Sequence, residues 1–334
     1  MTARPVTVQD RHWAQINEAG FVAGMRLMFW ICRIFGRWPF RLVLYPVLLW
    51  YLIAKPAARR ASADYLRRVC AFNSTRITPA AGIKPGMLSV LRHFASFGES
   101  ILDKMLVWSG LFKVEQTVLH GHEQVAQSIA QQRGGLLVCS HLGNLELCRV
   151  MSRRRAGLKL TVLVHTKHAQ TFNRMLGQLD PDSQLNLMQV TEITPATAMQ
   201  LSEKIEQGEF IVIAGDRVPV SQRPRVAIAS FLGQPAPFPV GPYILASLLQ
   251  CPIYMLFSMR TGQHSEIHFE LLRESVRLPR RGRDGRQGYD AALAELAAQY
   301  AARLEQFCLR APLQWFNFYD FWHLSTMDTI DASS

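Results

Sequence analysis

The chain is predicted to be an α/β protein, with a mixed, mostly parallel central sheet flanked by helices and an N-terminal apolar helical segment that associates with a membrane. Short apolar runs alternate with amphipathic stretches of helical length, the order expected when helices cover both faces of a sheet. The run Leu136–Cys139 is wholly apolar and lies between two glycines and a polar turn, as in a strand buried on both faces. Hydrophobicity is highest between Phe21 and Ala54, ahead of this alternation.

The charge composition indicates an acidic partner. The 334 residues include 37 lysines and arginines against 25 aspartates and glutamates, which gives a net charge of +12. Nucleic acid, anionic lipid headgroups and an acidic carrier protein are all attracted by such a charge. Nucleic acid is not predicted as a partner, because the sequence has no zinc finger, basic zipper or single-strand aromatic motif.

The first residues and the cysteines indicate a protein that faces the cytoplasm. Residues 1–20 form a polar leader, and its first part lacks the basic region, apolar core and cleavage site of a secretory signal. Six cysteines are scattered without a Cys-x-x-Cys motif, mostly in apolar surroundings, as expected of reduced and buried thiols.

Residues 21–75 are predicted to form the membrane-associated helical segment. The longest uncharged piece, Leu42–Ala54, is shorter than the about 20 residues that a bilayer crossing needs. A helical hairpin that lies in the cytoplasmic leaflet is therefore expected, with long cationic side chains that reach lipid phosphates. A helix pair packed on the core and a true single span are the alternatives. The cations in question are Arg26, Arg33, Arg37, Arg41, Lys55, Arg59, Arg60, Arg67 and Arg68.

Residues 76–325 are assigned to the main domain, and residues 326–334 to a flexible tail. Apolar spacing of three and four predicts helices over 78–111, 123–132, 196–207, 242–249 and 289–310. Apolar runs predict strands over 114–119, 136–139, 160–164, 187–190, 210–214, 253–259 and 268–272. The arginine-rich loop 272–288 is expected to be solvated, with docking of an acidic carrier or lipid headgroups as the alternative.

A histidine follows the buried strand at its carboxyl end, where catalytic groups of α/β proteins often lie. His141 can act as a general base on a hydroxyl. Glu146, near the start of the next helix, can accept a hydrogen bond from the other ring nitrogen of His141. An ordinary capped helix is the alternative explanation of this spacing. Ser140 has no Gly-x-Ser-x-Gly setting, so a serine hydrolase is not supported.

The residues around His141 resemble the His-x4-Asp/Glu block of the lysophospholipid acyltransferase superfamily, in the form found in late lipid A acyltransferases. Further similar blocks follow in the family's order, at 208–219, 231–236, 251–254 and 314–319. The similarity spans residues 26–322. Among these enzymes, the His-Leu-Gly-Asn-Leu-Glu sequence and the aromatic ending 315–322 look closest to acyltransferases of aryl polyene lipid pathways.

The resemblance implies a membrane-associated O-acyltransferase that moves a fatty acyl chain from a thioester to a hydroxyl of a lipid or glycolipid. Acyl carrier protein or acyl-CoA would be the donor, and attack would be direct, without an acyl-enzyme. The implied location is the bacterial inner membrane, on its cytoplasmic face, in a peripheral or monotopic manner. A non-catalytic lipid- or carrier-binding protein with the same fold is the alternative.

Polar groups at strand ends are the candidates for substrate binding or oxyanion stabilisation. The resemblance implies an arginine after the strand 160–164, and Thr166 or Lys167 falls at that position. An arginine at 217 suits a phosphate or a carrier phosphopantetheine. The candidate residues are Asn144, Lys167, Arg174, Asp216 and Arg217. His165 and His168 lie close together, but they have no identifiable third ligand, and neither a metal nor another cofactor is predicted.

Overall fold

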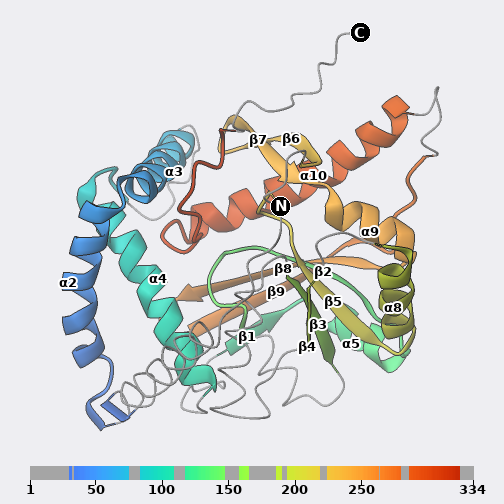
Figure 1. Cartoon of the computed structure of the whole chain (residues 1–334), viewed down its shortest axis with the longest axis horizontal. Helices are drawn as coiled ribbons and strands as arrows, with labels where there is room; N and C mark the ends of the chain where they lie inside the picture. Colours follow the sequence, from blue (N-terminus) through green and yellow to red (C-terminus); the bar gives the residue numbers. More distant parts are fainter. Residues whose placement is uncertain are drawn as a thin grey trace, which may run out of the picture.

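A seven-stranded sheet forms the centre of the computed structural model (Figure 1). The structure describes residues 30–31, 34–74, 83–108, 117–146, 158–164, 186–189, 194–218, 224–262, 264–279 and 286–323. The strand order across the sheet is β1-β9-β8-β2-β5-β3-β4. The strands are β1 (Thr117–His120), β2 (Gly135–Cys139), β3 (Lys159–Val164), β4 (Asn186–Gln189), β5 (Glu209–Ala214), β8 (Ile253–Thr261) and β9 (His264–Arg273).

The sheet is mostly parallel, which confirms the predicted fold class. Every pairing in it is parallel except that of β8 with β9. Strand β2 is the middle strand, between β8 and β5. The carboxyl ends of β2, β3, β5 and β8 therefore meet at one edge of the sheet, where side chains beyond one strand can reach those beyond its neighbour.

Two apolar layers cover the two faces of the sheet. Leu136 and Val138 of β2 belong to the larger layer, together with the apolar side of helix α10 (Arg286–Arg310). Leu137 and Cys139 belong to the other layer, together with Val125 of helix α5 (His122–Ala130). Successive side chains of a strand point to opposite faces, so an all-apolar β2 is what a strand covered on both faces requires.

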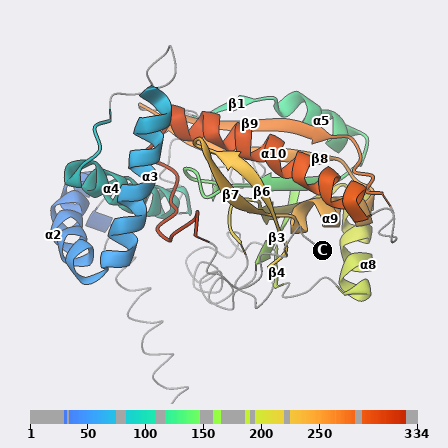
Figure 2. The same cartoon turned by 90° about the horizontal axis from the view of Figure 1, so that it is seen from above.

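Helices α2 (Trp38–Ala54), α3 (Pro56–Ser74) and α4 (Met87–Trp108) lie together at one end of the sheet, and α8 (Pro195–Glu206) and α9 (Gly241–Leu249) lie at the other (Figures 1 and 2). No single helix in the described ranges is long and apolar enough to span a bilayer, although α2 and α3 meet these criteria when taken together across a bend of 99°. Apolar side chains are exposed along α2, with Leu42, Trp50 and Ile53 among them.

Arg37 and Arg41, which are among the cations predicted to reach lipid phosphates, form ion pairs with another helix of the protein. Arg37 lies 2.6 Å from Asp103, and Arg41 lies 2.5 Å from Glu99, both on α4. These ion pairs fasten the start of α2 to α4. Lys55 and Arg60, at the junction of α2 with α3, are exposed as predicted.

A short hairpin was not predicted. Strands β6 (Val226–Phe231) and β7 (Gln234–Pro239) form a separate antiparallel pair. Leu232 and Gly233, both with positive φ, make the two-residue turn. The backbone N–H of Leu232 donates to Glu305 on α10 at 2.6 Å, so the hairpin is held against that helix.

The predictions for the chain ends concern residues outside the described ranges, whereas four of the six cysteines lie within them. The polar leader 1–20 and the tail 326–334 lie outside the described residues, as do residues 280–285 of the arginine-rich loop. Cys70, Cys139, Cys251 and Cys308 are free thiols, and the last three are buried, as predicted. Cys32 and Cys148 lie outside the described residues.

Candidate active site

The register of β2 and β5 brings His141 beside Asp216. Cys139, the last residue of β2, pairs with Ala214, the last residue of β5. The chains stay in step beyond the strands, where the backbone N–H of Gly215 donates to the carbonyl of Cys139 at 2.8 Å. His141 and Asp216 each come two residues after their strand ends, so they lie opposite one another.

Asp216 holds the imidazole of His141 by two hydrogen bonds. Its Oδ1 lies 2.8 Å from Nδ1 of His141, and its Oδ2 accepts the backbone N–H of His141 at 2.6 Å. The carboxylate is 1% exposed, whereas the His141 side chain is 33% exposed. With Nδ1 on Asp216, Nε2 is the ring nitrogen left for a substrate, and a carboxylate at Nδ1 favours the tautomer whose Nε2 can accept a proton.

Trp315 supplies a third donor to the same carboxylate. Its indole Nε1–H donates to Oδ2 of Asp216 at 2.8 Å. Burial alone would raise the pKa of Asp216, but His141, through its charge and hydrogen bonds, and the Trp315 indole outweigh burial and hold this pKa below its ordinary value. Asp216 is therefore an anion at neutral pH, despite its burial.

The segment after α10 passes directly over the turn that carries His141. The backbone N–H of Phe316 donates to the carbonyl of His141, and that of Gly143 donates to the carbonyl of Gln314, both at 2.9 Å. Leu142 and Trp315 thus form an isolated antiparallel bridge. The aromatic ending packs in the core, since Trp315, Phe316 and Phe321 are all buried.

His93 of α4 forms a hydrogen bond with the backbone of Trp315. Its Nε2 lies 2.9 Å from the carbonyl of Trp315, and its Nδ1 lies 2.9 Å from Oγ of Ser62 on α3. The carbonyl can only accept, so Nε2 carries the proton and Nδ1 accepts from the serine. Burial lowers the pKa of His93 from 6.5 to about 4, against the opposing effect of the Trp315 carbonyl, so the ring is neutral. His93 is thus a structural neighbour of the site.

A small polar pocket opens beside the turn that carries His141. It has a volume of about 180 Å³. Gly143 and Asn144 border it on one side, and Glu99, Asp103 and Arg260 border it on another. Asn144 accepts the backbone N–H of Glu146 on its Oδ1 at 3.1 Å, while its buried Nδ2 has no hydrogen-bond partner in the described part of the chain. Among the described residues, this amide is therefore an unpartnered donor at the border of the pocket.

The predicted site residues are only partly brought together. Asp216 was predicted to bind substrate or to stabilise an oxyanion. Both oxygens of this buried carboxylate accept hydrogen bonds from protein donors, so Asp216 is not placed to stabilise an oxyanion. Asp216 also occupies the position at Nδ1 of His141 that was predicted for Glu146, so the role of Glu146 stays a prediction. Arg217 is exposed, and its guanidinium lies 3.4 Å from the carbonyl of Phe316. Lys167 and Arg174 lie outside the described residues.

Ser140 is not placed as a nucleophile. It is buried, and its Oγ accepts the backbone N–H of Leu142 at 3.3 Å. The Ser140 hydroxyl thus stabilises the turn, which is consistent with the lack of a nucleophile-elbow motif in the sequence.

A family model for bacterial lipid A biosynthesis acyltransferases matches residues 93–323. The chain belongs to this family. The match covers β2, β5, α10 and the segment with Trp315, and therefore every contact that Asp216 makes. No curated protein sequence matches the chain.

Membership of the lipid A acyltransferase family makes this protein an acyltransferase of lipid biosynthesis, with an acyl donor and a lipid-like acceptor. The pairing of His141 with Asp216 and the part played by Trp315 are absent from the sequence-based site. One signal for the first was present, since both residues follow a buried apolar run by two positions. No pattern in the sequence around Trp315 indicates the hydrogen bond from its indole to Asp216.

Proposed function

We propose that this lipid A acyltransferase family member transfers a fatty acyl chain from a thioester, on acyl carrier protein, to a hydroxyl of a lipid or glycolipid, with His141 as general base. The observation that carries the proposal is the hydrogen bond of 2.8 Å between Nδ1 of His141 and the buried Asp216 carboxylate. It leaves Nε2, on a partly exposed ring, to meet the acceptor. A general base needs this combination of a fixed tautomer and an accessible nitrogen.

In the proposed reaction, Nε2 of His141 takes the proton of the acceptor hydroxyl as its oxygen attacks the thioester carbonyl. A tetrahedral oxyanion forms, and its collapse breaks the carbon–sulfur bond. The leaving thiolate takes the proton back from the imidazolium. Asp216 stabilises the imidazolium during this cycle, because the negative charge lies 2.8 Å from Nδ1.

Several groups are candidates for the oxyanion and for the polar part of the substrates. Asn144 borders the pocket with a free amide N–H, and Arg217 follows Asp216 at the same edge of the sheet. Lys167 and Arg174 remain candidates from the sequence. Donors fixed before the reaction stabilise developing charge at little reorganisation cost.

The proposed location is the cytoplasmic face of the inner membrane, where α2 would bind the lipid surface. The support is the run of exposed apolar side chains on α2, next to the exposed cations Lys55 and Arg60. An exposed apolar face of this kind marks an interaction site, and flanking cations favour anionic headgroups. The domain division at about residue 76, with a membrane segment ahead of an acyltransferase domain, belongs to the same proposal.

The acceptor is proposed to be a lipid other than a doubly phosphorylated glucosamine, with an aryl polyene lipid as the first candidate. Lipid A enzymes often carry basic residues after the tryptophan of the last block, whereas this chain has Asn317, Phe318, Tyr319 and Asp320. A glycerolipid, an ornithine lipid and a lipid A precursor are the other acceptors to be tested.

The test is transfer of a labelled acyl chain from acyl carrier protein into a lipid extract, followed by mass spectrometry of labelled lipids. Replacement of the base or of its carboxylate, in His141→Ala and Asp216→Asn, is expected to lower the rate by about 10²- to 10⁴-fold. Both variants should bind vesicles as the parent does.

Glu146→Gln is the matched comparison, because it removes the other carboxylate predicted for this role. An unchanged rate in Asp216→Asn together with a loss in Glu146→Gln would return the role to Glu146. Full activity of His141→Ala would end the proposed mechanism. Absence of transfer by the folded parent protein over several acyl lengths and with acyl-CoA as well would favour a binding protein with this fold.

A further inference from the structure

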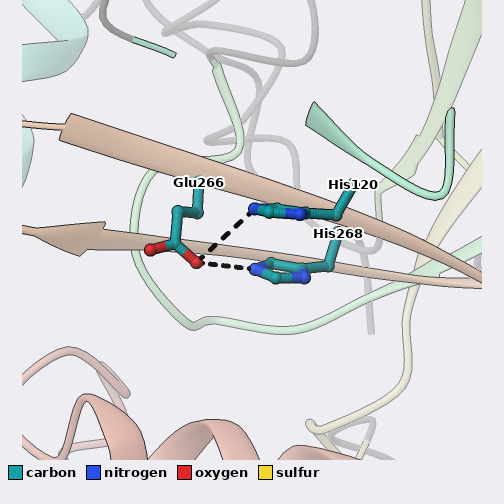
Figure 3. A group of neighbouring side chains, drawn as sticks. All are labelled: His120, Glu266 and His268. Carbon is teal, nitrogen blue, oxygen red and sulfur yellow. Dashed lines mark hydrogen bonds and ion pairs between the residues drawn. The ribbon is translucent and has the colours of Figure 1, made fainter. Parts of the chain in front are cut away.

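Two histidines and a glutamate meet at the β1–β9 edge of the sheet (Figure 3). His120 is the last residue of β1, and its partner in the parallel register is His268 of β9. Glu266 comes two residues before His268 on the same strand. Residues paired across two strands share a face, as do residues two apart on one strand, so all three side chains leave the sheet on one side.

The potential ligand atoms converge on a single point. Nε2 of His268 lies 3.0 Å from Oε2 of Glu266, and Nε2 of His120 lies 3.8 Å from the same oxygen. The two imidazole rings are stacked, with centroids 4.3 Å apart and an angle of 12° between their planes. All three ligand atoms lie within 4.8 Å of one another.

These separations are close to those in a metal site. A tetrahedral ion with bonds of about 2.0–2.1 Å holds neighbouring ligand atoms about 3.3 Å apart. The two nitrogen–oxygen distances of 3.0 and 3.8 Å lie on either side of that value. His120, whose side chain is 48% exposed, has room for the small rotation that would bring its Nε2 nearer to that of His268.

The surroundings fit an ion bound at moderate strength. His268 and Glu266 are mostly shielded, while His120 leaves one side open, where water can be the remaining ligand. Phe307 of α10 packs against His268 at 4.8 Å between ring centroids and limits how that ring can turn. Arg310 lies 3.0 Å from Oε2 of Glu266, and its positive charge weakens the binding of a metal ion at this oxygen.

We propose that His120, Glu266 and His268 bind a divalent transition-metal ion of the Zn²⁺ type, with water completing the coordination. Two imidazoles and one carboxylate are the nitrogen and oxygen ligands that such ions accept, and no thiol takes part. The bound ion would tie the edge strand β1 to β9, beside the end of α10.

The cluster is not visible in the sequence as a metal motif. His120 is separated from Glu266 by most of the catalytic domain, and Glu-x-His alone matches no ligand spacing of a known finger or protease motif. The antiparallel β8–β9 turn and the β1–β9 register bring the three residues together.

The experiment is a titration of metal-free protein with Co²⁺, which reports its ligands through visible absorption. Intense tetrahedral bands without thiolate charge-transfer bands are expected for the full chain. Replacement of the exposed ligand, in His120→Ala, is expected to weaken Co²⁺ binding by about 100-fold or more, since one of three protein ligands is lost. In parallel, Zn²⁺ should raise the Tm of the parent protein but not that of the variant.

Two variants serve as controls. His264→Ala removes an exposed histidine from the same strand β9, and the double variant His165→Ala/His168→Ala removes two histidines that lie close together in the sequence. Both variants should bind Co²⁺ as the parent does. Absence of Co²⁺ binding by the parent, or unchanged binding by His120→Ala, would overturn the proposal. Acyl transfer is not the readout, so failure of this proposal is separate from failure of the proposed reaction.

Discussion

At the scale of single residues, Asp216 combines nearly complete burial with a negative charge. The desolvation of a lone carboxylate costs several kcal/mol. Three hydrogen-bond donors offset this desolvation cost, namely the ring and the backbone N–H of His141 and the indole of Trp315. Because its pKa is lowered in the folded protein, the stability that Asp216 contributes is present above the ordinary carboxyl pKa and is lost as pH falls through its folded value.

Gly143 permits the sharp turn that places His141. Its φ is +63°, and a Cβ there would lie 2.2 Å from the carbonyl oxygen of Ser258. Gly143→Ala is therefore expected to lower the free energy of unfolding by about 3 kcal/mol or more, from left-handed strain together with the clash, and to reduce activity. Urea denaturation and the transfer assay measure both effects.

Gly262→Ala is the control for the strain alone. Gly262 has a φ of +62°, yet nothing lies within 4 Å of the added Cβ. This variant should lose only about 1–2 kcal/mol. Equal losses in the two variants would show that Ser258 moves aside and that the close approach at Gly143 is unimportant.

Residue-scale features were predictable where the chemistry is local. His141 comes two residues after the end of its strand, and its neighbours form a recognisable block, so the sequence singled it out as a candidate. Its partner lies 75 residues away and is selected by the register of β2 and β5. A nearer acidic residue, Glu146, was preferred because spacing along the chain is visible in a sequence, whereas register is not.

At the scale of elements, His93 links three separate parts of the chain. Ser62 lies on α3, His93 on α4, and Trp315 on the segment after α10. The sequence placed His93 on a helix correctly, but it could not say what the ring contacts. The buried ring makes the packing of these parts sensitive to acid.

Acid is expected to destabilise the protein through His93. The folded protein keeps the ring neutral down to about pH 4, while the unfolded chain takes up a proton below about pH 6.5. The free energy of unfolding should therefore fall as pH is lowered from 6.5 to 4, by about 3 kcal/mol from this group. His93→Gln keeps a donor and an acceptor without titrating, so its stability should depend less on pH in this window.

His323→Gln, which removes an exposed histidine, is the comparison for denaturation curves at several pH values. A pH dependence that is the same in His93→Gln as in the parent protein would mean that other groups cause it.

The β6–β7 hairpin shows why one element escaped prediction. Strand β7 has prolines at 235, 237 and 239, and prolines within a run argue against a strand. They are tolerated because the sheet has two strands only, so a proline can turn its missing N–H outward. The central strands β2 and β5, in contrast, consist almost wholly of apolar residues, and the strands of the large sheet were predicted to within a few residues.

At the scale of the whole molecule, α2 has an apolar face that the described part of the protein leaves uncovered. Trp50 is 66% exposed, and Leu42 and Ile53 are exposed as well. The substitutions Leu42→Asp, Trp50→Asp and Ile53→Asp, made together, are expected to release the protein from vesicles that contain anionic lipid, because they remove apolar area and add negative charge. Vesicle sedimentation measures the change.

Met199→Asp is the matched control, since Met199 is also 66% exposed but lies on α8, at the other end of the sheet. It should sediment with vesicles as the parent does. Unchanged sedimentation of the triple variant would exclude this face of α2 as the membrane contact. Leu48 and Leu52 are buried, so the exposed face is altered without removing the packing of α2.

The contact between Trp315 and Asp216 also bears on the order in which the protein is made. Translation delivers α2 well before the segment that follows α10. A nascent chain therefore has α2 and Asp216 before it has the third donor to that carboxylate. A messenger truncated ahead of Gln314 encodes every helix and strand that the structure describes but not the strap that closes the turn. The full set of hydrogen bonds to Asp216 thus forms only after α10 and the strap have been made.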